Sequence, residues 1–415
     1  MRIEEVRNGA RDALQKGLFR RARDLCDIGL NQAPAESEAS TLRELRADAE
    51  RGLHPAPPAA AAPPAAFWRG TEAFGRGELT AAAALFRQAL REAPDCAEAH
   101  AHLGMALVGA GEYREGWQEY EWRARVPWGA PRTMSAPRWD GQPMDGRVLV
   151  LWDEQGHGDA IQFIRFAAPA AAASRATVVF HGRPRLARLF QSAAGVAVSI
   201  RRDQDFPAPH AQASLMSLPA ILGLDDPQPA AVPYLAAEPS RVAAWRDRLA
   251  ASPRPWVGLV WQGNPGFFND GQRSVPLASY LPLLRRFAGR ATFFALQKGE
   301  GESQIEALPH DVALQPLGRH LDAGPDGFVD TAAVIASLDL VITTDTSIAH
   351  LAGGLGGPVW IVLGHGADWR WGQSDRTAFY PRARLFRRQA AEEWSSLVER
   401  LAAAAEDVLA GQARA

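Results

Sequence analysis

The chain has 415 residues, a length typical of two or three domains with sizeable cores, and its formal net charge is −2. A net charge so close to zero gives no reason to expect nucleic acid or an acidic membrane surface as a partner. Because the two cysteines lie far apart, and because neither a signal segment nor a bilayer-length apolar run is present, we expect a cytoplasmic protein without disulfides or a membrane span.

A self-similarity of 34 residues runs through residues 63–125. Gly70 recurs as Gly104, and Phe86 recurs as Tyr120. Small residues mark close contacts between paired helices, and aromatic residues fill the groove between them. The pattern resembles the tetratricopeptide repeat (TPR), a unit of two antiparallel helices.

A weaker copy lies upstream, with Ala13, Gly17 and Pro34 at compatible spacing, and residues 42–49 could form the first helix of another copy. The register breaks at residues 54–66 (HPAPPAAAAPPAA), a Pro/Ala tract that predicts a linker or spacer. We therefore expect TPR-like helical repeats over residues 1–130. Such an array can bind a peptide or protein segment, or it can serve as a packing or dimerisation module that would make the chain a homo-oligomer.

From Gly146 onward, apolar strand patterns alternate with helical stretches. The predicted strands of a first series are residues 147–152, 177–181 and 196–200, and those of a second series are residues 256–261, 291–296, 338–343 and 359–363. Alternation of this kind indicates doubly wound α/β sheets. We expect one Rossmann-like domain over residues 146–250, a second over residues 251–390, and a C-terminal helix in residues 391–415.

The second series contains the most informative segment, LVITTDTSIAHLAGGLGGPVWIVL at residues 340–363. Its strand ends at Thr344, an N-cap sequence follows at residues 345–347, and Gly356 and Pro358 end the helix before another strand. A helix that begins at the carboxyl end of a strand offers free N–H groups and the positive end of its dipole to a ligand there. The segment therefore predicts a βαβ unit that binds an anion such as phosphate.

Five motifs follow one another in the α/β part of the chain: WDEQGHGDAIQFIRF, VGLVWQGNPGFFNDGQRSVPL, DTSIAHLAGGLGGPVWIVL, DWRW and YPRARLFRR. Together with the repeats they resemble bacterial TPR-containing glycosyltransferases whose catalytic part is related to the family-nine heptosyltransferases. They also resemble, more distantly, the O-linked N-acetylglucosamine transferases. The resemblance implies a GT-B fold, in which two Rossmann-like domains face a cleft. It further implies a nucleotide-sugar donor held mainly by the second domain, with no metal and no cofactor.

In the first half, the resemblance places a general base at Asp159, directly after Gly158. A carboxylate can take the proton of an acceptor hydroxyl when it lies within hydrogen-bond reach. Asp159 could instead only cap the helix that follows, which is a common position for Asp. His157 is an alternative base or acceptor contact, and Gly156 and Gly158 allow the backbone to turn tightly and approach a ligand.

In the second half, the resemblance places a cation on the donor's phosphates, and Arg273 matches that position best. A guanidinium can clamp a diphosphate with two parallel hydrogen bonds and offset the charge of the leaving group. Arg273 could also be an exposed loop arginine. Gln262 and Asn264, in the same loop, are further candidates for donor binding.

The predicted helix start supplies four more donor-binding candidates. Thr346 and Ser347 could donate hydrogen bonds to the β-phosphate, Asp345 could hold hydroxyls of the sugar, and His350 lies one helical turn further on. The alternatives are plain N-capping for Asp345 and an interdomain packing role for His350.

The last candidates follow strand ends. Gln297 and Lys298 end the predicted strand 291–296, where contact with base or ribose and solvation at the surface are equally compatible with the sequence. Trp369 and Trp371 could stack on a base or sugar, or they could pack against the TPR module.

These roles combine into one hypothesis, an inverting transferase in which Asp159 deprotonates an acceptor hydroxyl and Arg273 stabilises the departing phosphate. The repeats would recruit a protein acceptor, so protein O-glycosylation is the favoured activity, and flagellin is a client of some enzymes of the resembling kind. Two alternatives remain: a transferase that acts on a cell-envelope glycolipid, and a non-catalytic scaffold that retains the fold.

Overall fold

A computed structural model describes residues 3–15, 19–30, 38–45, 63–129, 134, 136–206, 209–228, 232–267 and 269–412. The chain divides into two compact units, Met1–Ala62 and Pro63–Ala415. The first unit contains α1 (Ile3–Gln15), α2 (Phe19–Leu30) and a helix at residues 38–45, packed around Val6, Ala10, Cys26 and Leu42. Residues 46–49 and 54–62, which belong to the predicted third helix and the predicted linker, lie outside the described residues, as do Gly17 and Pro34.

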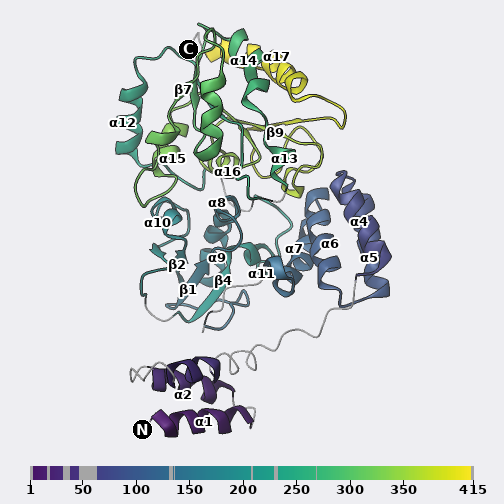
Figure 1. Cartoon of the computed structure of the whole chain (residues 1–415), viewed down its shortest axis with the longest axis vertical. Helices are drawn as coiled ribbons and strands as arrows, with labels where there is room; N and C mark the ends of the chain where they lie inside the picture. Colours follow the sequence, from purple (N-terminus) through teal and green to yellow (C-terminus); the bar gives the residue numbers. More distant parts are fainter. Residues whose placement is uncertain are drawn as a thin grey trace. The chain divides into compact units, whose positions relative to one another are not determined.

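The second unit begins with a helical module, which we define as residues 63–129 (Figure 1). Its elements are α4 (Ala65–Gly75), α5 (Leu79–Glu92), α6 (Ala97–Ala110), α7 (Tyr113–Tyr120) and the 3-10 turns η1 (Glu121–Arg125) and η2 (Pro127–Gly129). A Cβ added at Gly70 would lie 2.6 Å from the ring of Phe86, and one at Gly104 would lie 2.4 Å from the backbone nitrogen of Tyr120. In each helix pair the glycine thus lies against the repeated aromatic residue, through the ring of Phe86 in the first pair and through the backbone of Tyr120 in the second.

The first α/β half contains a four-stranded parallel sheet in the order β3-β2-β1-β4. Its strands are β1 (Val148–Trp152), β2 (Thr177–Gly182), β3 (Val198–Arg201) and β4 (Ala211–Ser214). Its helices are α8 (His157–Phe163), η3 (Ile164–Phe166), α9 (Ala167–Ser174), α10 (Pro184–Phe190), η4 (Leu215–Ser217) and α11 (Leu218–Ile221). The helix predicted after β1 is therefore divided by a 3-10 turn.

The second α/β half contains a six-stranded parallel sheet in the order β10-β9-β8-β5-β6-β7. Its strands are β5 (Trp256–Val260), β6 (Thr292–Ala295), β7 (Gln315–Pro316), β8 (Leu340–Thr344), β9 (Val359–Leu363) and β10 (Ala383–Arg387). Its helices are α12 (Pro239–Leu249), α13 (Asp270–Arg273), η5 (Leu277–Tyr280), α14 (Leu281–Arg286), η6 (Gly299–Ala307), η7 (Gly318–His320), α15 (Val329–Ile335), α16 (Ser347–Gly354), η8 (Trp369–Trp371) and α17 (Trp394–Gln412). The predicted pair of Rossmann-like halves, and the βαβ unit β8–α16–β9, are confirmed.

The sequence analysis did not predict three of the strands in the structure. β4 has the sequence AQAS, with no branched apolar residue, and β7 is only two residues long. β10 (ARLFR) contains arginines at its second and last positions, so its sequence suggests a surface loop. Each of these strands is paired by its neighbours in the sheet, and propensity alone predicts such strands poorly.

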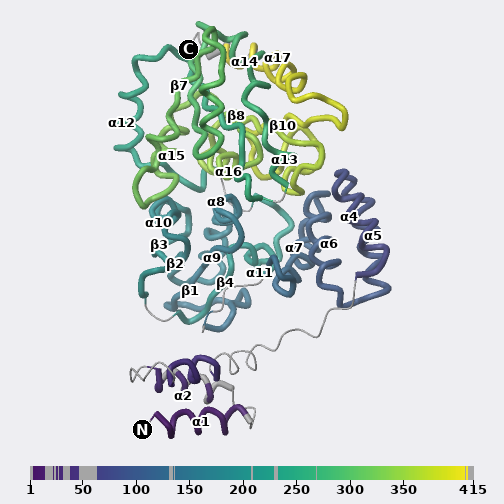
Figure 2. The backbone as a smooth tube through the Cα atoms, viewed as in Figure 1, coloured from purple at the N-terminus to yellow at the C-terminus, as the bar shows by residue number. Residues whose placement is uncertain are grey.

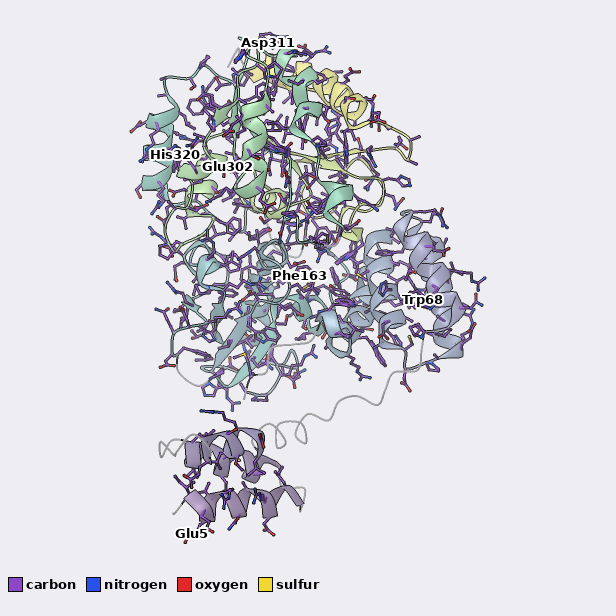
Figure 3. All side chains as sticks on the ribbon, viewed as in Figure 1. Glu5, Trp68, Phe163, Glu302, Asp311 and His320 are labelled. Atoms are coloured by element: carbon purple, nitrogen blue, oxygen red, sulfur yellow. The ribbon has the colours of Figure 1, made fainter. Side chains whose placement is uncertain are left out.

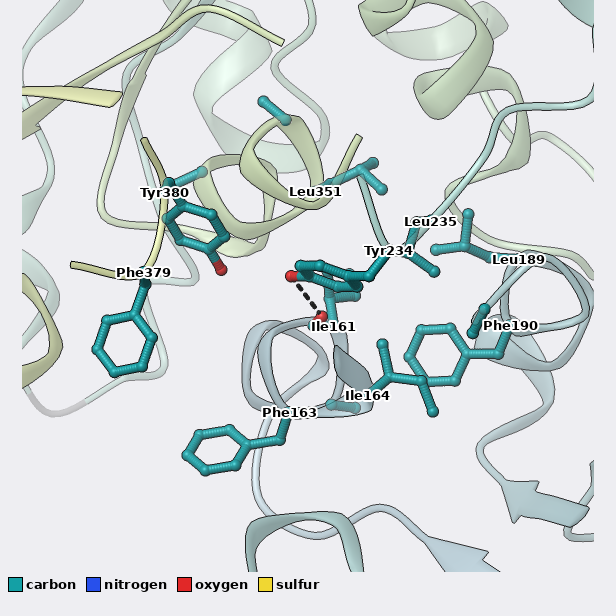
Figure 4. Close-up of a cluster of buried hydrophobic side chains, with 14 of the residues drawn as sticks. Ile161, Phe163, Ile164, Leu189, Phe190, Tyr234, Leu235, Leu351, Phe379 and Tyr380 are labelled. Atoms are coloured by element: carbon teal, nitrogen blue, oxygen red, sulfur yellow. Dashed lines mark hydrogen bonds between the residues drawn. The ribbon is translucent and has the colours of Figure 1, made fainter. Parts of the chain in front are cut away.

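One hydrophobic core joins the helical module to both α/β halves. Trp117 and Tyr120 of α7 belong to the same buried cluster as Leu149 of β1 and Leu351 of α16. Figure 4 shows part of this cluster, where the Tyr234 hydroxyl donates a hydrogen bond of 3.0 Å to the backbone oxygen of Ile161. A second core covers the other face of the second sheet beneath α14 and α17.

Candidate functional site

The second sheet has its topological switch point at β5, which lies between β6 on one side and β8 on the other. Ligands of open α/β sheets bind at such a point, outside the carboxyl ends of the strands. The loop after β5 begins at Trp261, and the loop after β8 begins at Asp345. The two loops predicted to bind the donor therefore both begin at the edge of the sheet where this topology favours a ligand.

Hydrogen bonds tie these two loops together. The Arg273 guanidinium donates to the backbone oxygen of Asp345 (3.2 Å), and the Thr344 hydroxyl donates to the backbone oxygen of Arg273. Arg273 also donates to Asp270 Oδ1 (2.9 Å), and its guanidinium lies 4.4 Å from the ring centre of Phe267. The guanidinium is therefore fixed beside the start of α16, with about a fifth of its side chain exposed.

The start of α16 is formed as the N-cap sequence predicts, with Thr346 as the capping residue. The Thr346 hydroxyl accepts a hydrogen bond of 3.3 Å from the backbone N–H of Ile348 and lies 3.2 Å from the Thr343 hydroxyl. The hydroxyl of the half-buried Ser347 has no hydrogen-bond partner among the described residues. The first turn of α16 thus retains donors that an anionic ligand could use.

Four predicted donor-binding residues lie around the loop after β5 and the end of β6. Gln297 is buried, and its amide receives hydrogen bonds from the backbone N–H groups of Trp261 and Gln262, so it joins the ends of β5 and β6. The Gln262 side chain accepts from Gln304 (2.8 Å). Exposed Asn264 accepts from the backbone of its own turn, and the Lys298 ammonium donates to the backbone oxygen of Leu321. All hydrogen bonds of the Gln297 side chain are made to backbone groups at this edge of the sheet, so this side chain holds the edge together.

At the edge of the first sheet, the carboxylate of Asp159 is held by two donors. Oδ2 accepts a hydrogen bond of 2.7 Å from the backbone N–H of Gly156, which closes a capping arrangement at the start of α8. Oδ1 pairs with the guanidinium of Arg370. The capping role considered for Asp159 is therefore present, and the ion pair with Arg370 is an additional contact.

Helices α8 and α16 meet at their N-terminal ends, and their adjacency can be followed along the tube in Figure 2. A Cβ added at Gly158 would lie 3.1 Å from Cδ2 of His350 and 3.5 Å from Cα of Ser347. Gly158 therefore allows close approach of α16, and the predicted approach of its backbone to a ligand stays a prediction. This contact places Asp159 of the first half beside the helix start of the second half.

His350 is buried between the two halves. Its Nδ1 lies 2.8 Å from the Tyr380 hydroxyl, and its ring stacks on Trp371 with 5.1 Å between the ring centres. Burial, together with the charges of Arg370 and Arg165, holds the pKa of His350 well below its usual value. His350 is thus a neutral packing residue at neutral pH, as its interdomain alternative predicts.

The two tryptophans of the DWRW motif are buried, so their ring faces contact protein. Trp369 packs against Trp117 and Tyr120 of the helical module, at centre distances of 6.0 and 5.6 Å, and Trp371 packs against His350. This arrangement corresponds to the packing alternative for the motif.

The residue that the sequence analysis missed in this motif is Arg370. It pairs with Asp368 at 2.9 Å and with Asp159, and these carboxylates raise its pKa although burial acts in the opposite direction. The only sequence signal was an arginine flanked by aromatic residues in DWRW.

Two further groups at the interface have shifted pKa values. Burial, assisted by the neighbouring Asp368 carboxylate, raises the pKa of Asp345 to about 6. At the other sheet edge, burial and then the charge of Arg183 lower the pKa of His157, whose ring lies 5.6 Å from that of Phe328. Perturbed groups gathered at one interface are typical of functional sites.

A pocket of about 570 Å³ lies between the helical module and residues 370–379. Its walls include the α4–α5 turn at residues 77–81 and the end of α6 at residues 108–111, and Arg370 belongs to its lining. The pocket therefore adjoins the Asp159–Arg370 ion pair from the side of the module.

Within the described part of the chain, no group of three or more His, Cys, Asp or Glu side chains is placed to hold a metal ion. No helix among the same residues has both the length and the apolar character needed to cross a membrane.

No model of a known protein family matches the chain. The chain is 28% identical over 379 residues to Protein FlbA of Caulobacter vibrioides, and the match covers 81% of this chain but only 61% of FlbA. The chain thus spans less than two thirds of the length of this relative.

Several solved structures are similar to the chain. They include the E. coli ADP-heptose LPS heptosyltransferase II, with a TM-score of 0.48, 15% identity and coverage of 64% of this chain and 99% of that chain. A glycosyl transferase of family 9 from Veillonella parvula has a TM-score of 0.47, 12% identity and coverage of 66% and 100%. The O-GlcNAc transferase of Thermobaculum terrenum has a TM-score of 0.27, 16% identity and coverage of 99% and 93%.

Proposed function

We propose that the chain is an inverting, metal-independent glycosyltransferase that moves a sugar from a nucleotide-sugar donor to an acceptor hydroxyl. The observation that carries this proposal is the meeting of α8 and α16 at their N-terminal ends, which brings the Asp159 carboxylate to the helix start beside Arg273. Such a site offers a proton acceptor on one side and anion-stabilising groups on the other, which is what sugar transfer from a diphosphate needs.

The donor's diphosphate would lie at the first turn of α16. Ser347 and the helix dipole would face its oxygens there, and the Arg273 guanidinium would bind them from the loop after β5. Asp345, whose side chain is half-buried at the same point, would accept hydrogen bonds from hydroxyls of the sugar. The second half would therefore bind the donor.

Asp159 would act as general base on the acceptor. A carboxylate offers about four lone-pair positions, so the contacts with Gly156 and Arg370 leave room for an acceptor hydroxyl. About a fifth of the Asp159 side chain is exposed, which permits such an approach. The acceptor oxygen would attack the anomeric carbon from the face opposite the phosphate, which inverts its configuration.

The acceptor we favour is a protein recruited by the helical repeats, with flagellin as one candidate, in the cytoplasm. Trp68 of α4 and Trp128 of η2 are about half exposed on the helical module, and Figure 3 marks Trp68. Aromatic side chains exposed on a repeat array are typical anchors for a partner protein. A glycolipid acceptor and a non-catalytic scaffold remain the alternatives.

A nucleotide-sugar panel tests the donor half of the proposal. A donor at 100 times its dissociation constant should stabilise the folded chain by roughly 2.7 kcal/mol, which a thermal unfolding scan detects. The stabilising donor should also be hydrolysed slowly in the absence of acceptor. If no nucleotide sugar raises the unfolding temperature and none is hydrolysed, the proposal is wrong and the scaffold alternative is favoured.

The acceptor class is tested by removing residues 1–62, which form a compact unit of their own, and by Trp68→Ala in the full chain. If the repeats recruit a protein, both changes should reduce transfer to that protein and leave donor hydrolysis intact. Equal loss of hydrolysis and transfer would contradict recruitment by the repeats. Transfer to glycolipid but not to protein would favour the glycolipid alternative.

A further inference from the structure

Arg370 contacts Asp159, packs on a ring that the helical module holds, and belongs to the lining of the pocket beside them. Its guanidinium donates to Asp159 Oδ1 and to both carboxylate oxygens of Asp368, the latter at 3.0 and 2.9 Å. Only 9% of its side chain is exposed. A buried charge is stable in such a place only with close partners of opposite sign, so this ion-pair triad holds the guanidinium in one position.

Asp159 is constrained in the same way. One oxygen is fixed by Arg370, and the other is fixed by the backbone N–H of Gly156 at the start of α8. A carboxylate held through both oxygens has one orientation of its plane. A proton acceptor must be held in productive geometry, because small displacements are costly for the rate.

The helical module sets the place of Arg370. The guanidinium carbon lies 4.4 Å from the ring centre of Trp369, and that ring packs against Trp117 and Tyr120 of α7. On its other side Trp369 touches α6, where a Cβ added at Gly109 would lie 2.9 Å from the backbone oxygen of Trp369. The contacts therefore run from α7 through the indole ring of Trp369, and from α6 through its backbone, to the ion pair with Asp159.

Arg370 also retains an unused donor. Its Nε is buried and has no hydrogen-bond partner within the described residues, and the residue lines the pocket of about 570 Å³. Arg370 thus borders that pocket and also contacts the carboxylate of Asp159.

We propose that Arg370 is a positioning residue for the transfer reaction, which aims the Asp159 carboxylate from a place fixed by the helical module. This inference rests on the proposed function. In the reaction the acceptor O–H bond breaks and its proton passes to Asp159. The acceptor oxygen then bonds to the anomeric carbon as the bond from that carbon to the phosphate oxygen breaks, and the nucleotide diphosphate leaves with the electron pair. Arg370 touches neither substrate and acts through Asp159 alone.

The test compares Arg370→Gln and Arg370→Lys with a matched control, Arg254→Gln. Arg254 also stacks on a tryptophan (Trp256, 4.0 Å) and also pairs with an aspartate (Asp339), but it lies at the amino end of β5, away from the interface. The measurements are kcat and the KM for the donor.

We expect Arg370→Gln to lower kcat at neutral pH by about tenfold or more and to leave the donor KM nearly unchanged, because it alters the proton acceptor and not the phosphate site. Arg370→Lys, which keeps a cationic donor for Asp159, should restore part of kcat. Arg254→Gln should behave as the unaltered chain. An Arg370→Gln variant whose kcat equals that of Arg254→Gln would overturn the inference and leave the proposed function intact.

A second measurement needs no turnover. The unfolding temperatures of Asp159→Asn, Arg370→Gln and the double variant form a cycle, and coupled residues give a double variant whose loss is smaller than the sum of the single losses. Additive losses would overturn the inference even if the donor panel shows that the proposed function is correct. If coupling is present but no donor is bound or hydrolysed, the proposed function fails, and the catalytic role of Arg370 fails with it.

Discussion

The two α/β halves present different carboxyl edges to one another. On the first edge three acidic groups are paired with arginines: Asp153 with Arg183 and Arg202, Glu154 with Arg123, and Asp159 with Arg370. On the second edge the start of α16 retains the unpartnered Ser347 hydroxyl, and Asp345 has no arginine within ion-pair distance among the described residues. The acidic groups named on the first edge thus have partners within the protein, whereas the second edge keeps groups that a ligand could bind.

This difference suggests a division of labour between the halves. A network of ion pairs within the protein fixes the geometry of a reacting group, so changes on the first edge should alter kcat. Groups without protein partners gain most from a ligand, so changes on the second edge should alter affinity for the donor. Each prediction below tests one side of this division.

The largest effect should come from Asp159→Asn. An amide cannot accept the proton of the acceptor hydroxyl, so transfer should fall by about 10²–10⁴-fold, the usual contribution of a general base. Asparagine keeps an oxygen for the N–H of Gly156, so α8 should remain capped and donor affinity should stay the same. Single-turnover transfer and equilibrium titration of the donor measure the two quantities. Asp311→Asn, which removes an exposed pair with Arg285, is the control. If Asp159→Asn transferred sugar at the same rate as Asp311→Asn, Asp159 would not be the base.

Arg273→Gln should affect the second edge instead. Loss of a charge-assisted hydrogen bond to phosphate costs about 1.5–3 kcal/mol, which corresponds to roughly a 10- to 150-fold weaker donor affinity. Arg285→Gln, an arginine of the same half that pairs with Asp311 at the surface, is the matched control. Titration with the stabilising donor gives both dissociation constants. Equal affinity in the two variants would mean that Arg273 only supports its loop through Asp270 and Asp345.

The fold could be predicted from the sequence largely because its signals are local. Each repeat brings its own glycine–aromatic pair, such as Gly104 with Tyr120, and the βαβ segment around Thr346 carries cap, helix and stop within a short stretch. β4 and β10 could not be predicted, since their own composition is unsuited to strands and only their pairing with β1 and β9 completes them.

The candidate site could be predicted only in part, because only its local signals can be found in the sequence. The motifs located the loops that meet at β5 and β8, but they did not reveal how the side chains divide between ligand and protein. Gln297 is used by the ends of β5 and β6, and Trp371 by His350. The partner of Asp159 could not be found, because Arg370 lies 211 residues away and only the fold brings the two together.

Gly158→Ala tests the contact between the two edges. The added methyl would lie 3.1 Å from the His350 ring, so the halves must separate slightly, at a cost of about 1–3 kcal/mol typical of overpacking. We expect a lower unfolding temperature and a several-fold loss of both kcat and donor affinity. Gly75→Ala, where nothing lies within 4 Å of the added methyl, should not reduce stability. If Gly158→Ala matched Gly75→Ala in stability and activity, the helix contact would not be needed by the site.

The smallest effect concerns pH and separates the edges by their titrating groups. Burial and Asp368 raise the pKa of Asp345 to about 6, so its carboxylate is ionised above that pH and repels an anionic donor at the start of α16. As the pH falls through about 6, protonation removes this repulsion, and donor affinity should rise a few-fold between about pH 7.5 and 5.5. Asp345→Asn carries no charge at either pH, so its affinity should depend little on pH. His157→Gln controls for the first edge, since that imidazole gains a proton in the acid direction and its pKa is also lowered. A pH dependence that persists in Asp345→Asn but disappears in His157→Gln would place the titrating group on the first edge and contradict the division drawn here.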